Sequence, residues 1–215
     1  GFRGFGRAVG SGMPKPAKAV KTLLLINIGV FIFQAISGDS DPRGTQPISR
    51  LLAVTGGDWL QAWRYITFQF LHANFWHIAL NMLGLYMLGT PLERQWGTKR
   101  FTWFYLTCGA VAGMAYAGMV WAADVDKGTP LVGASGGVYA IVLACAVLFP
   151  QIKLILLLFP VPIRFASLLI FGYAGLTVLT GISNGAYESG EFWSQVAHLG
   201  GVVAGAFWIW GLPVL

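Results

Sequence analysis

The chain has 215 residues, of which 56% are hydrophobic and only 10% are charged, and its formal net charge at pH 7 is +6. Soluble domains carry about a quarter charged residues, so this composition excludes a soluble globular fold, a disordered chain and a disulfide-rich secreted scaffold. The expected solvent is therefore the lipid bilayer.

Six stretches are apolar enough to be predicted as transmembrane helices, each of which needs about 20 residues. In chain order they cover residues 19–37, 75–91, 101–122, 134–149, 165–183 and 193–212. The fourth stretch is short and rich in glycine at its start, so we expect it to begin below the membrane surface. An apolar run from Leu154 to Pro162 is too short to span a bilayer and contains two prolines, which favours an interfacial loop segment.

The remaining segments complete a simple predicted organisation. Residues 1–18 are expected to form a flexible basic tail, and residues 19–215 a single domain. The longest connection, residues 38–74, is rich in apolar and aromatic side chains, so we expect it to lie in the membrane interface. The fold class is thus all-α, a polytopic six-helix bundle.

The distribution of charge predicts the orientation of the bundle. The tail and the second and fourth connections carry ten basic residues and one acid, whereas the other connections carry four basic residues and seven acids. Because Lys and Arg accumulate in cytoplasmic loops, both termini are expected in the cytoplasm. The positive charge is therefore a topology signal, and no nucleic-acid partner is expected.

A few polar residues lie at or within the predicted spans, where a polar or ionisable group is a functional hypothesis by default. They are His72, His77, Asn81, Ser135 and His198. His77 and Asn81 are four residues apart and share one helix face. No Asp or Glu lies within a span, so a Ser-His-Asp triad is not expected, and a Ser-His pair is what the sequence permits.

Glycines provide a way for that pair to meet. Ser135 opens the fourth span between small residues, and His198 is followed by Gly201 and Gly205, a spacing that lets two helices approach closely. A buried neutral imidazole could then take the proton of the serine hydroxyl. The backbone N–H of Ser135, the His77 ring and the Asn81 amide are suitable donors for the oxyanion that would form.

At these residues the chain resembles the rhomboid family of intramembrane serine proteases. The matching elements are Trp63-Arg64, the set His72, His77 and Asn81, the run Gly133-Ala134-Ser135-Gly136, and His198-Leu199-Gly200-Gly201 followed by Gly205. They occur in this order over roughly residues 60 to 205, on six predicted spans of the expected topology.

The resemblance implies a role for each matched residue. Ser135 would be the nucleophile, His198 the general base, and His77 and Asn81 the oxyanion donors, with Tyr139 packed against the His198 ring. The supporting positions would be Gly133, Gly136, Gly201, Gly205, His72, Trp63 and Arg64. Transmembrane protein substrates would enter laterally past the fifth span, and cleavage would occur near the outer face.

Each residue taken alone also has a purely structural interpretation. A membrane-helix serine usually bonds a carbonyl or lets helices approach, and Asn81 and Tyr139 would ordinarily serve packing. Trp63 is typical of an interfacial anchor, and Arg64 of a snorkelling or headgroup-binding charge, alongside a role in shaping the loop. His72 is predicted to be structural and to satisfy backbone groups.

Two other functions are weighed against proteolysis. A non-catalytic rhomboid-like protein that binds or escorts membrane proteins would lack the serine or the histidine, and both are present. A small transporter would need charged or broken-helix coordination at mid-membrane, for which the glycine-rich start of the fourth span is the one candidate. No metal or other cofactor is expected, and Cys108 and Cys145 are predicted to be buried thiols. We expect an integral protein of a bacterial plasma membrane, with an oligomeric state that the sequence does not specify.

Overall fold

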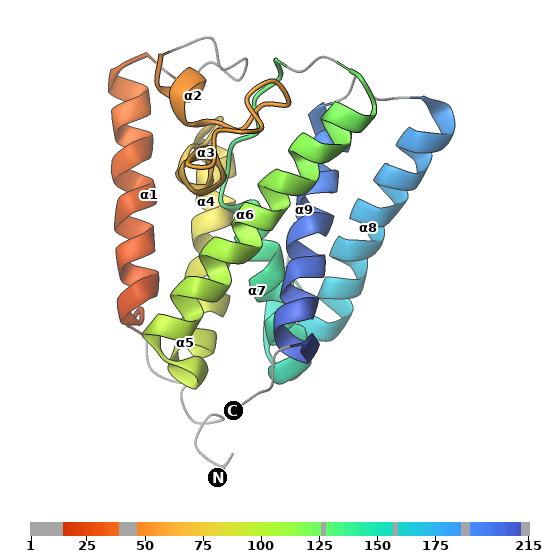
Figure 1. The fold of residues 1–215 in the computed structure, drawn as a ribbon. Helices are drawn as coiled ribbons and strands as arrows, with labels where there is room; N and C mark the ends of the chain where they lie inside the picture. The colour runs from red at the N-terminus through yellow and green to blue at the C-terminus, as the bar shows by residue number, and fades with distance from the viewer. Residues whose placement is uncertain (1–14, 39–46, 126–127, 157–158, 186–189, 212–215) are drawn as a thin grey trace.

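A computed structural model describes residues 15–38, 47–125, 128–156, 159–185 and 190–211. The structure is built almost wholly of helices (Figure 1). In chain order these are α1 (Lys18–Ile36), α2 (Pro47–Leu52), α3 (Arg64–Thr67), the 3₁₀ turn η2 (Phe68–Phe70), α4 (Phe75–Gly84), the π-helical turn η3 (Leu85–Gly89), α5 (Thr90–Trp96), α6 (Thr98–Ala122), α7 (Ser135–Leu148), α8 (Ile163–Asn184), α9 (Gly190–Ala206) and the π-helical turn η4 (Phe207–Gly211). The prediction of a mostly helical fold is confirmed.

Each of the six predicted spans overlaps a long helical segment. These segments are α1, the continuous α4–η3–α5 run, α6, α7, α8 and the α9–η4 run. Among the described residues, α1, α6 and α8 are long and apolar enough to cross a membrane by themselves, whereas α7 is apolar but only 14 residues long. The crossing of all six segments, and the cytoplasmic position of both ends, stay predictions.

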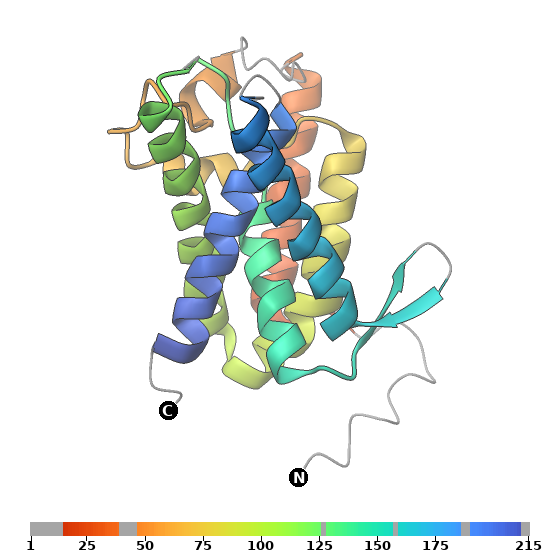
Figure 2. The same ribbon diagram turned by 90° about the vertical axis from the view of Figure 1, so that its right-hand side faces the viewer.

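The segment predicted as an interfacial loop contains a small β-hairpin. Strands β1 (Lys153–Leu156) and β2 (Phe159–Pro162) pair antiparallel, with Leu154 opposite Val161 and Ile155 opposite Pro160 (Figure 2). The prediction of a loop there was incomplete, because two prolines disfavour a central strand but are tolerated in a two-stranded ribbon, where every strand is an edge.

The helix α7 lies in the middle of the bundle and contacts α4, α6, α8 and α9 (Figures 1 and 2). Glycines allow these helices to touch at the backbone. A Cβ added at Gly136 would lie 2.4 Å from the Cβ of Ala112 in α6, and one added at Gly201 would lie 2.3 Å from the carbonyl oxygen of Gly136. The predicted approach of the fourth and sixth spans through small residues therefore occurs.

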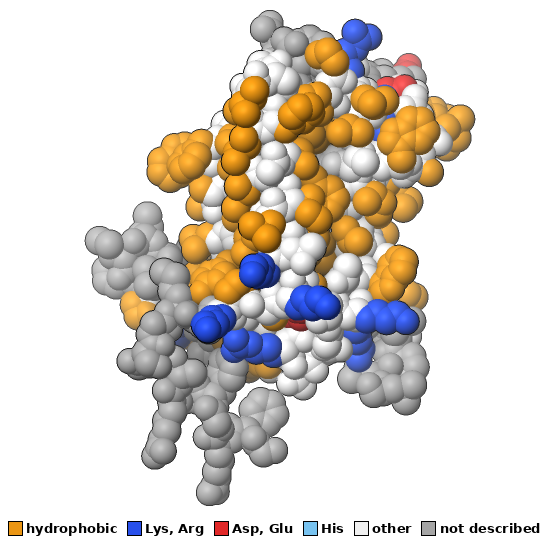
Figure 3. Space-filling model, turned by 90° about the vertical axis from the view of Figure 1, so that its left-hand side faces the viewer, with side chains coloured by type: hydrophobic (Ala, Val, Ile, Leu, Met, Phe, Trp, Pro, Cys, Tyr) orange, Lys and Arg blue, Asp and Glu red, His pale blue; other side chains and the backbone are white. Residues whose placement is uncertain are grey.

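Basic side chains gather at one end of the bundle. Figure 3 shows a band of Lys and Arg across the end where α1 begins, next to an apolar face. The residues at the helix ends there are Lys15, Lys18, Lys21, Arg94, Lys99 and Arg100. The one acid predicted on this side, Glu93, is buried, and its carboxylate accepts hydrogen bonds from the backbone N–H groups of Ala19 and Val20 at 2.8 and 2.9 Å. It therefore caps the positive end of α1.

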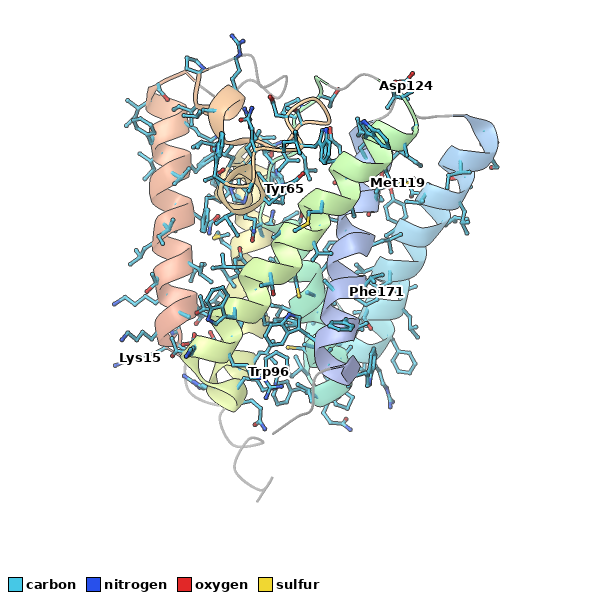
Figure 4. The ribbon with its side chains drawn as sticks, in the orientation of Figure 1. Lys15, Tyr65, Trp96, Met119, Asp124 and Phe171 are labelled. Carbon is cyan, nitrogen blue, oxygen red and sulfur yellow. The ribbon has the colours of Figure 1, made fainter. Side chains whose placement is uncertain are left out.

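The described part of the connection between α1 and α4, residues 47–74, lies toward the opposite end of the bundle. In Figure 4, Tyr65 of this connection and Asp124, which follows α6, lie far from Lys15 and Trp96. Arg64 organises this connection. Only 5% of its surface is exposed, and its guanidinium donates to the Ala53 carbonyl at 2.6 Å and to Oε1 of Gln61 at 2.7 Å. The interpretation of Arg64 as a snorkelling or headgroup-binding charge is therefore wrong, and its loop-shaping role is what the contacts support.

The aromatic neighbours of Arg64 are tied to the same connection. The indole of Trp63 is half exposed and donates to the carbonyl of Leu51 at 3.2 Å, and the Tyr65 hydroxyl donates to the carbonyl of Trp59 at 2.6 Å. Burial raises the pKa of the Tyr65 phenol. An antiparallel bridge between Val54 and Leu131 then joins this connection to the segment that leads into α7.

Candidate active site

Ser135 is the first residue of α7, and the segment before it places that helix start inside the bundle. The chain descends from the end of α6 before α7 begins, so α7 starts deeper than the neighbouring helices end (Figure 1). The start of α7 is therefore recessed within the bundle, and its depth below the membrane surface stays a prediction. As the first helical residue, Ser135 has a backbone N–H without an acceptor within the helix.

Gly133 shapes the turn into α7 and cannot be replaced without strain. Its φ is +126°, which L side chains rarely adopt, and its N–H donates to the carbonyl of Phe68 at 2.9 Å. A Cβ at this position would also lie 2.7 Å from Nε2 of His77 and 3.8 Å from Oγ of Ser135. A side chain at position 133 would therefore collide with the His77 ring and lie next to the Ser135 hydroxyl, and glycine leaves this space free.

Ser135 and His198 meet across the α7–α9 contact. Oγ of Ser135 lies 2.8 Å from Nε2 of His198, a hydrogen-bond distance, although the two residues are 63 positions apart in the chain. His198 is only 9% exposed. The Tyr139 ring stacks on the imidazole with centroids 4.0 Å apart and an interplanar angle of 16°. The two predicted partners are thus together, and the imidazole ring is held from one face.

His77 presents a donor toward the same place. Its backbone N–H is capped by the side chain of Asn74, whose Oδ1 accepts at 2.9 Å where α4 begins. Its ring nitrogen Nδ1 accepts a hydrogen bond from the N–H of Ala73 at 3.4 Å. In a neutral ring the proton then resides on Nε2, the nitrogen that faces the side-chain space left free by Gly133. His77 therefore has the geometry of a hydrogen-bond donor to the site.

Asn81 lies one turn further along α4 and is buried. One N–H of its amide donates to the carbonyl of His77 at 2.9 Å. This bond lies within α4, so it is not the helix–helix contact expected of a packing asparagine, and it restrains the side chain. The amide carries a second N–H, so an oxyanion contact is compatible with the bond.

Gln195 is a polar neighbour of the site that the sequence analysis missed. Its Oε1 lies 2.9 Å from Nδ1 of His198, on the side of the ring opposite Ser135, and the residue is 7% exposed. The available signal was its position three residues before His198 in a predicted span, where an amide shares a helix face with the histidine.

Among the residues that the structure describes, no group of three or more His, Cys, Asp or Glu side chains could hold a metal ion. Cys108 and Cys145 are buried free thiols. The polar atoms gathered at the site are therefore a hydroxyl, imidazoles, amides and backbone N–H groups, and their chemistry is that of nucleophilic attack and proton transfer.

The family model of the Rhomboid domain matches residues 60–213, which is most of the chain. The match includes every residue of the site described in this subsection. The chain belongs to the rhomboid family. It is accordingly an integral membrane protein, in agreement with its apolar helices.

Several rhomboid relatives resemble the chain over much of its length. It is 31% identical over 147 residues to the mitochondrial Rhomboid protein 1 of Saccharomyces cerevisiae, which covers 66% of the chain and 39% of that protein. It is 31% identical over 198 residues to Rhomboid-related protein 3 of Homo sapiens, covering 86% of the chain and 45% of the relative. Identity to the Rhomboid protease AarA of Providencia stuartii is 28% over 206 residues, covering 86% and 69% of the two proteins.

The names of these relatives indicate the activity of the family. Proteins named rhomboid proteases are among them, so intramembrane proteolysis is supported at the level of the family. The chain spans less than half the length of the first two relatives. Because relatives named mitochondrial occur beside bacterial proteases, the predicted bacterial plasma membrane stays a prediction.

The other positions that match the rhomboid family differ in how they are related to the Ser135–His198 contact. The His72 ring is buried and packs edge-on against His77, with centroids 5.1 Å apart. Gly205 lies against Ala140 of α7, one turn beyond the contact of Gly201 with Gly136. By contrast, Trp63 and Arg64 belong to the connection over the end of the bundle, and their side chains donate hydrogen bonds to other residues of that connection. Their effect on the site is therefore indirect.

Proposed function

We propose that this chain is an intramembrane serine endopeptidase in which Ser135 is the nucleophile and His198 the general base. The observation that carries the proposal is the 2.8 Å contact between Oγ of Ser135 and Nε2 of His198. A serine hydroxyl is a weak nucleophile until a neighbouring base accepts its proton, and this contact supplies the base.

The proposed reaction has two half-reactions. Oγ of Ser135 attacks the scissile carbonyl carbon while its proton passes to Nε2 of His198, which gives a tetrahedral oxyanion. The C–N bond then breaks, the imidazolium returns the proton to the leaving amine, and an acyl-enzyme remains. Water attacks this ester with His198 again as base, which releases the new carboxyl terminus and restores the Ser135 hydroxyl.

Three donors are proposed to stabilise the oxyanion. They are Nε2–H of His77, the second amide N–H of Asn81 and the backbone N–H of Ser135. The tautomer assigned to His77 supports its role, because Nδ1 is already occupied by the N–H of Ala73. Donors held in place before the reaction stabilise the developing charge without reorganisation, and such stabilisation usually lowers the barrier to acyl transfer more than any other single effect.

The substrate is proposed to be a transmembrane segment that reaches the site from the side. A membrane helix has its carbonyls hydrogen-bonded, so the scissile peptide must first unwind, which small residues and glycine make easier. We propose α8 as the lateral gate, the element that moves to admit the segment. Of the three helices long and apolar enough to cross a membrane, α8 has the smallest buried share, 22% against 28% for α1 and 56% for α6, so its displacement disturbs less packing than that of α6.

The alternative of a non-catalytic escort protein is disfavoured by the same geometry. Such a protein has no use for a serine hydroxyl directed at a buried imidazole, because placing an ionisable side chain inside a membrane bundle costs free energy. Here Ser135, His198 and the stacked Tyr139 form one contiguous arrangement.

The test combines covalent labelling with proteolysis in proteoliposomes. A fluorophosphonate probe should label the wild type and a Ser167→Ala control, which removes another serine whose hydroxyl bonds a helix carbonyl. Ser135→Ala and His198→Ala should abolish both labelling and cleavage of a transmembrane reporter, with melting temperatures near that of the wild type. Substantial cleavage by a folded Ser135→Ala protein would contradict the proposal.

A further inference from the structure

The imidazole of His198 has a polar partner at each of its two ring nitrogens, and one of these partners, Gln195, is buried. Nε2 lies 2.8 Å from Oγ of Ser135, and Nδ1 lies 2.9 Å from Oε1 of Gln195. Both Gln195 and His198 lie on α9 and are at least nine-tenths buried. The ring is therefore held between a hydroxyl from α7 and an amide from its own helix.

This geometry fixes where the ring proton must be for catalysis. To accept the proton of Ser135, Nε2 needs a free lone pair, so in the neutral ring the proton resides on Nδ1. A buried Nδ1–H requires an acceptor, and the amide oxygen of Gln195 stands at hydrogen-bond distance from it.

We propose that Gln195 is a positioning residue of the dyad, whose amide oxygen holds His198 in the tautomer that leaves Nε2 free to take the proton of Ser135. The inference rests on the proposed serine-protease function. When the imidazolium forms, Nδ1–H and Nε2–H are both donors, and Gln195 continues to accept from Nδ1 while Nε2–H turns to the leaving amine. In a Ser-His-Asp triad this task belongs to a carboxylate. The amide does it here without a buried charge.

An amide differs from a carboxylate because it has two ends. With its oxygen toward Nδ1, Gln195 favours the productive tautomer, but a flipped amide would donate to Nδ1 and place the ring proton on Nε2, where it opposes attack by Ser135. A glutamate at position 195 would present an acceptor oxygen to Nδ1 in either orientation of its carboxylate. A methionine would keep the length of the side chain and remove the oxygen acceptor.

The first experiment uses the ring itself as reporter and needs no activity. Histidine labelled with ¹⁵N is incorporated into the full chain, and its three residues are assigned with His72→Asn and His77→Asn variants. The His198 spectrum of the wild type should show a protonated Nδ1 and an unprotonated Nε2. Gln195→Met should shift the population toward the other tautomer. An unchanged tautomer in folded Gln195→Met protein would overturn the inference.

The second experiment measures turnover in proteoliposomes. Gln195→Met should lower kcat by about 10- to 100-fold with little change in KM, which is less than the roughly 10⁴-fold loss when the acid of a triad is neutralised. Gln195→Glu should restore most of the rate and move the acidic limb of the pH–rate profile to higher pH, because a carboxylate stabilises the imidazolium. A merely structural side chain would not shift this limb.

The pH profile must be interpreted against the other groups around His198. They are His77 from α4, Tyr139 from α7, and the contact of Tyr173 in α8 with Glu191 at the start of α9, whereas α6 approaches through Ala112 and Ala115 beside Gly200. None of these is altered in the Gln195 variants, so a shift between them and the wild type belongs to position 195.

The outcomes separate the two proposals. If Ser135→Ala abolishes cleavage but Gln195→Met retains wild-type kcat, the dyad stands and Gln195 has no positioning role. If Ser135→Ala remains active, the protease proposal itself fails. Should Gln195→Met not fold, Gln195→Glu decides alone, because an unshifted acidic limb in that variant also overturns the inference.

Discussion

The helices α6 and α8 are both long and apolar, yet they are held very differently. In an apolar 18-residue segment of each helix, 56% of the residues are buried in α6 but only 22% in α8. Glycines near the site and glycines in the middle of α8 also differ in how closely neighbouring atoms approach them. Around α6, α7 and α9 an added Cβ at Gly136, Gly200 or Gly201 would lie within 3 Å of a neighbour, whereas at Gly172 and Gly175, in the middle of α8, it would meet no atom of the described chain within 4 Å. Gly181, near the end of α8, is the exception, because a Cβ there would lie 2.3 Å from Phe192. The same residue therefore fixes the site in one region and leaves a helix loosely packed in the other.

The difference suits the proposed protease, which must hold two side chains firmly and still admit a substrate helix. Ser135 and His198 come from the tightly packed pair α7 and α9, so their 2.8 Å contact depends on a backbone-to-backbone approach. The α8 helix contributes no member of the dyad, and one of its rings, Phe171, touches the site through Tyr139. Motion of α8 can thus be tolerated where motion of α9 cannot.

The largest effect should follow from disrupting the tight region, which we define as the packed helices α6, α7 and α9; the loose region is α8. Gly201→Ala would place a Cβ 2.3 Å from the carbonyl oxygen of Gly136, so α9 must move away from α7. We expect a loss of about 1–3 kcal/mol in the free energy of unfolding. A shift of about 1 Å in the dyad should lower kcat by at least about 100-fold.

Gly172→Ala is the matched control in the loose region, because its Cβ would meet open space. It should unfold at or slightly above the wild-type temperature, since alanine favours a helix by about 1 kcal/mol over glycine. Thermal unfolding in detergent and initial cleavage rates measure both variants. Equal behaviour of the two would refute the contrast between the regions.

A smaller effect is expected from the oxyanion side of the tight region. Asn81→Ala should lower turnover by about 10- to 1000-fold, the range for one lost donor, while substrate binding changes far less. Single-turnover cleavage of prebound reporter separates the two quantities. If binding weakens and turnover of bound substrate is unchanged, the bond from Asn81 to the His77 carbonyl is its whole function.

The loose region can be tested at the ring that touches the site. Phe171→Ala removes the contact with Tyr139, whose rings lie 6.1 Å apart, and should cost about 1–2 kcal/mol, less than a fully buried phenylalanine. The rate of transmembrane cleavage, divided by the rate of fluorophosphonate labelling, should be preserved or rise, because labelling does not require the lateral gate to open.

Leu176→Ala is the control for this change. Leu176 also lies on α8, but it is 61% exposed and so contributes little to packing within the protein. Its replacement should change stability by less than about 0.5 kcal/mol and leave the ratio unaltered. A fall of the ratio in Phe171→Ala alone would mean that α8 guides substrate instead of blocking it.

What could be predicted from the sequence follows the same division between local and relative properties. Apolar length is a property of one segment, so the helical segments were predictable. The small residues that bring α7 against α9 were visible as Gly136, Gly201 and Gly205. These features together favour a contact between Ser135 and His198, which the structure contains.

Properties that depend on how helices rotate against one another were not predictable. Gln195 shares a face with His198, but an amide in a membrane helix usually joins helices, so its use depends on the ring orientation. The burial of Arg64 depends on the path of the connection, because the carbonyl of Ala53 and the side chain of Gln61 must converge on it. Four-residue strands with two prolines give too weak a pattern to predict the β1–β2 hairpin.

The smallest effect concerns a single contact between the loose and the tight region. The hydroxyl of Tyr173 in α8 donates to the carboxylate of Glu191 at the start of α9, and Tyr173 is 54% exposed. Tyr173→Phe removes the donor and keeps the ring, so α8 loses a tie to α9 with little change in packing. An exposed bond contributes at most about 1 kcal/mol, so the cleavage-to-labelling ratio should rise by about two- to fivefold. Glu191→Gln keeps an acceptor for the hydroxyl and should give a smaller rise, because the bond to a neutral oxygen is weaker. If Tyr173→Phe lowers labelling and cleavage equally, the tie supports the dyad itself and α8 is not the independent, mobile element proposed here.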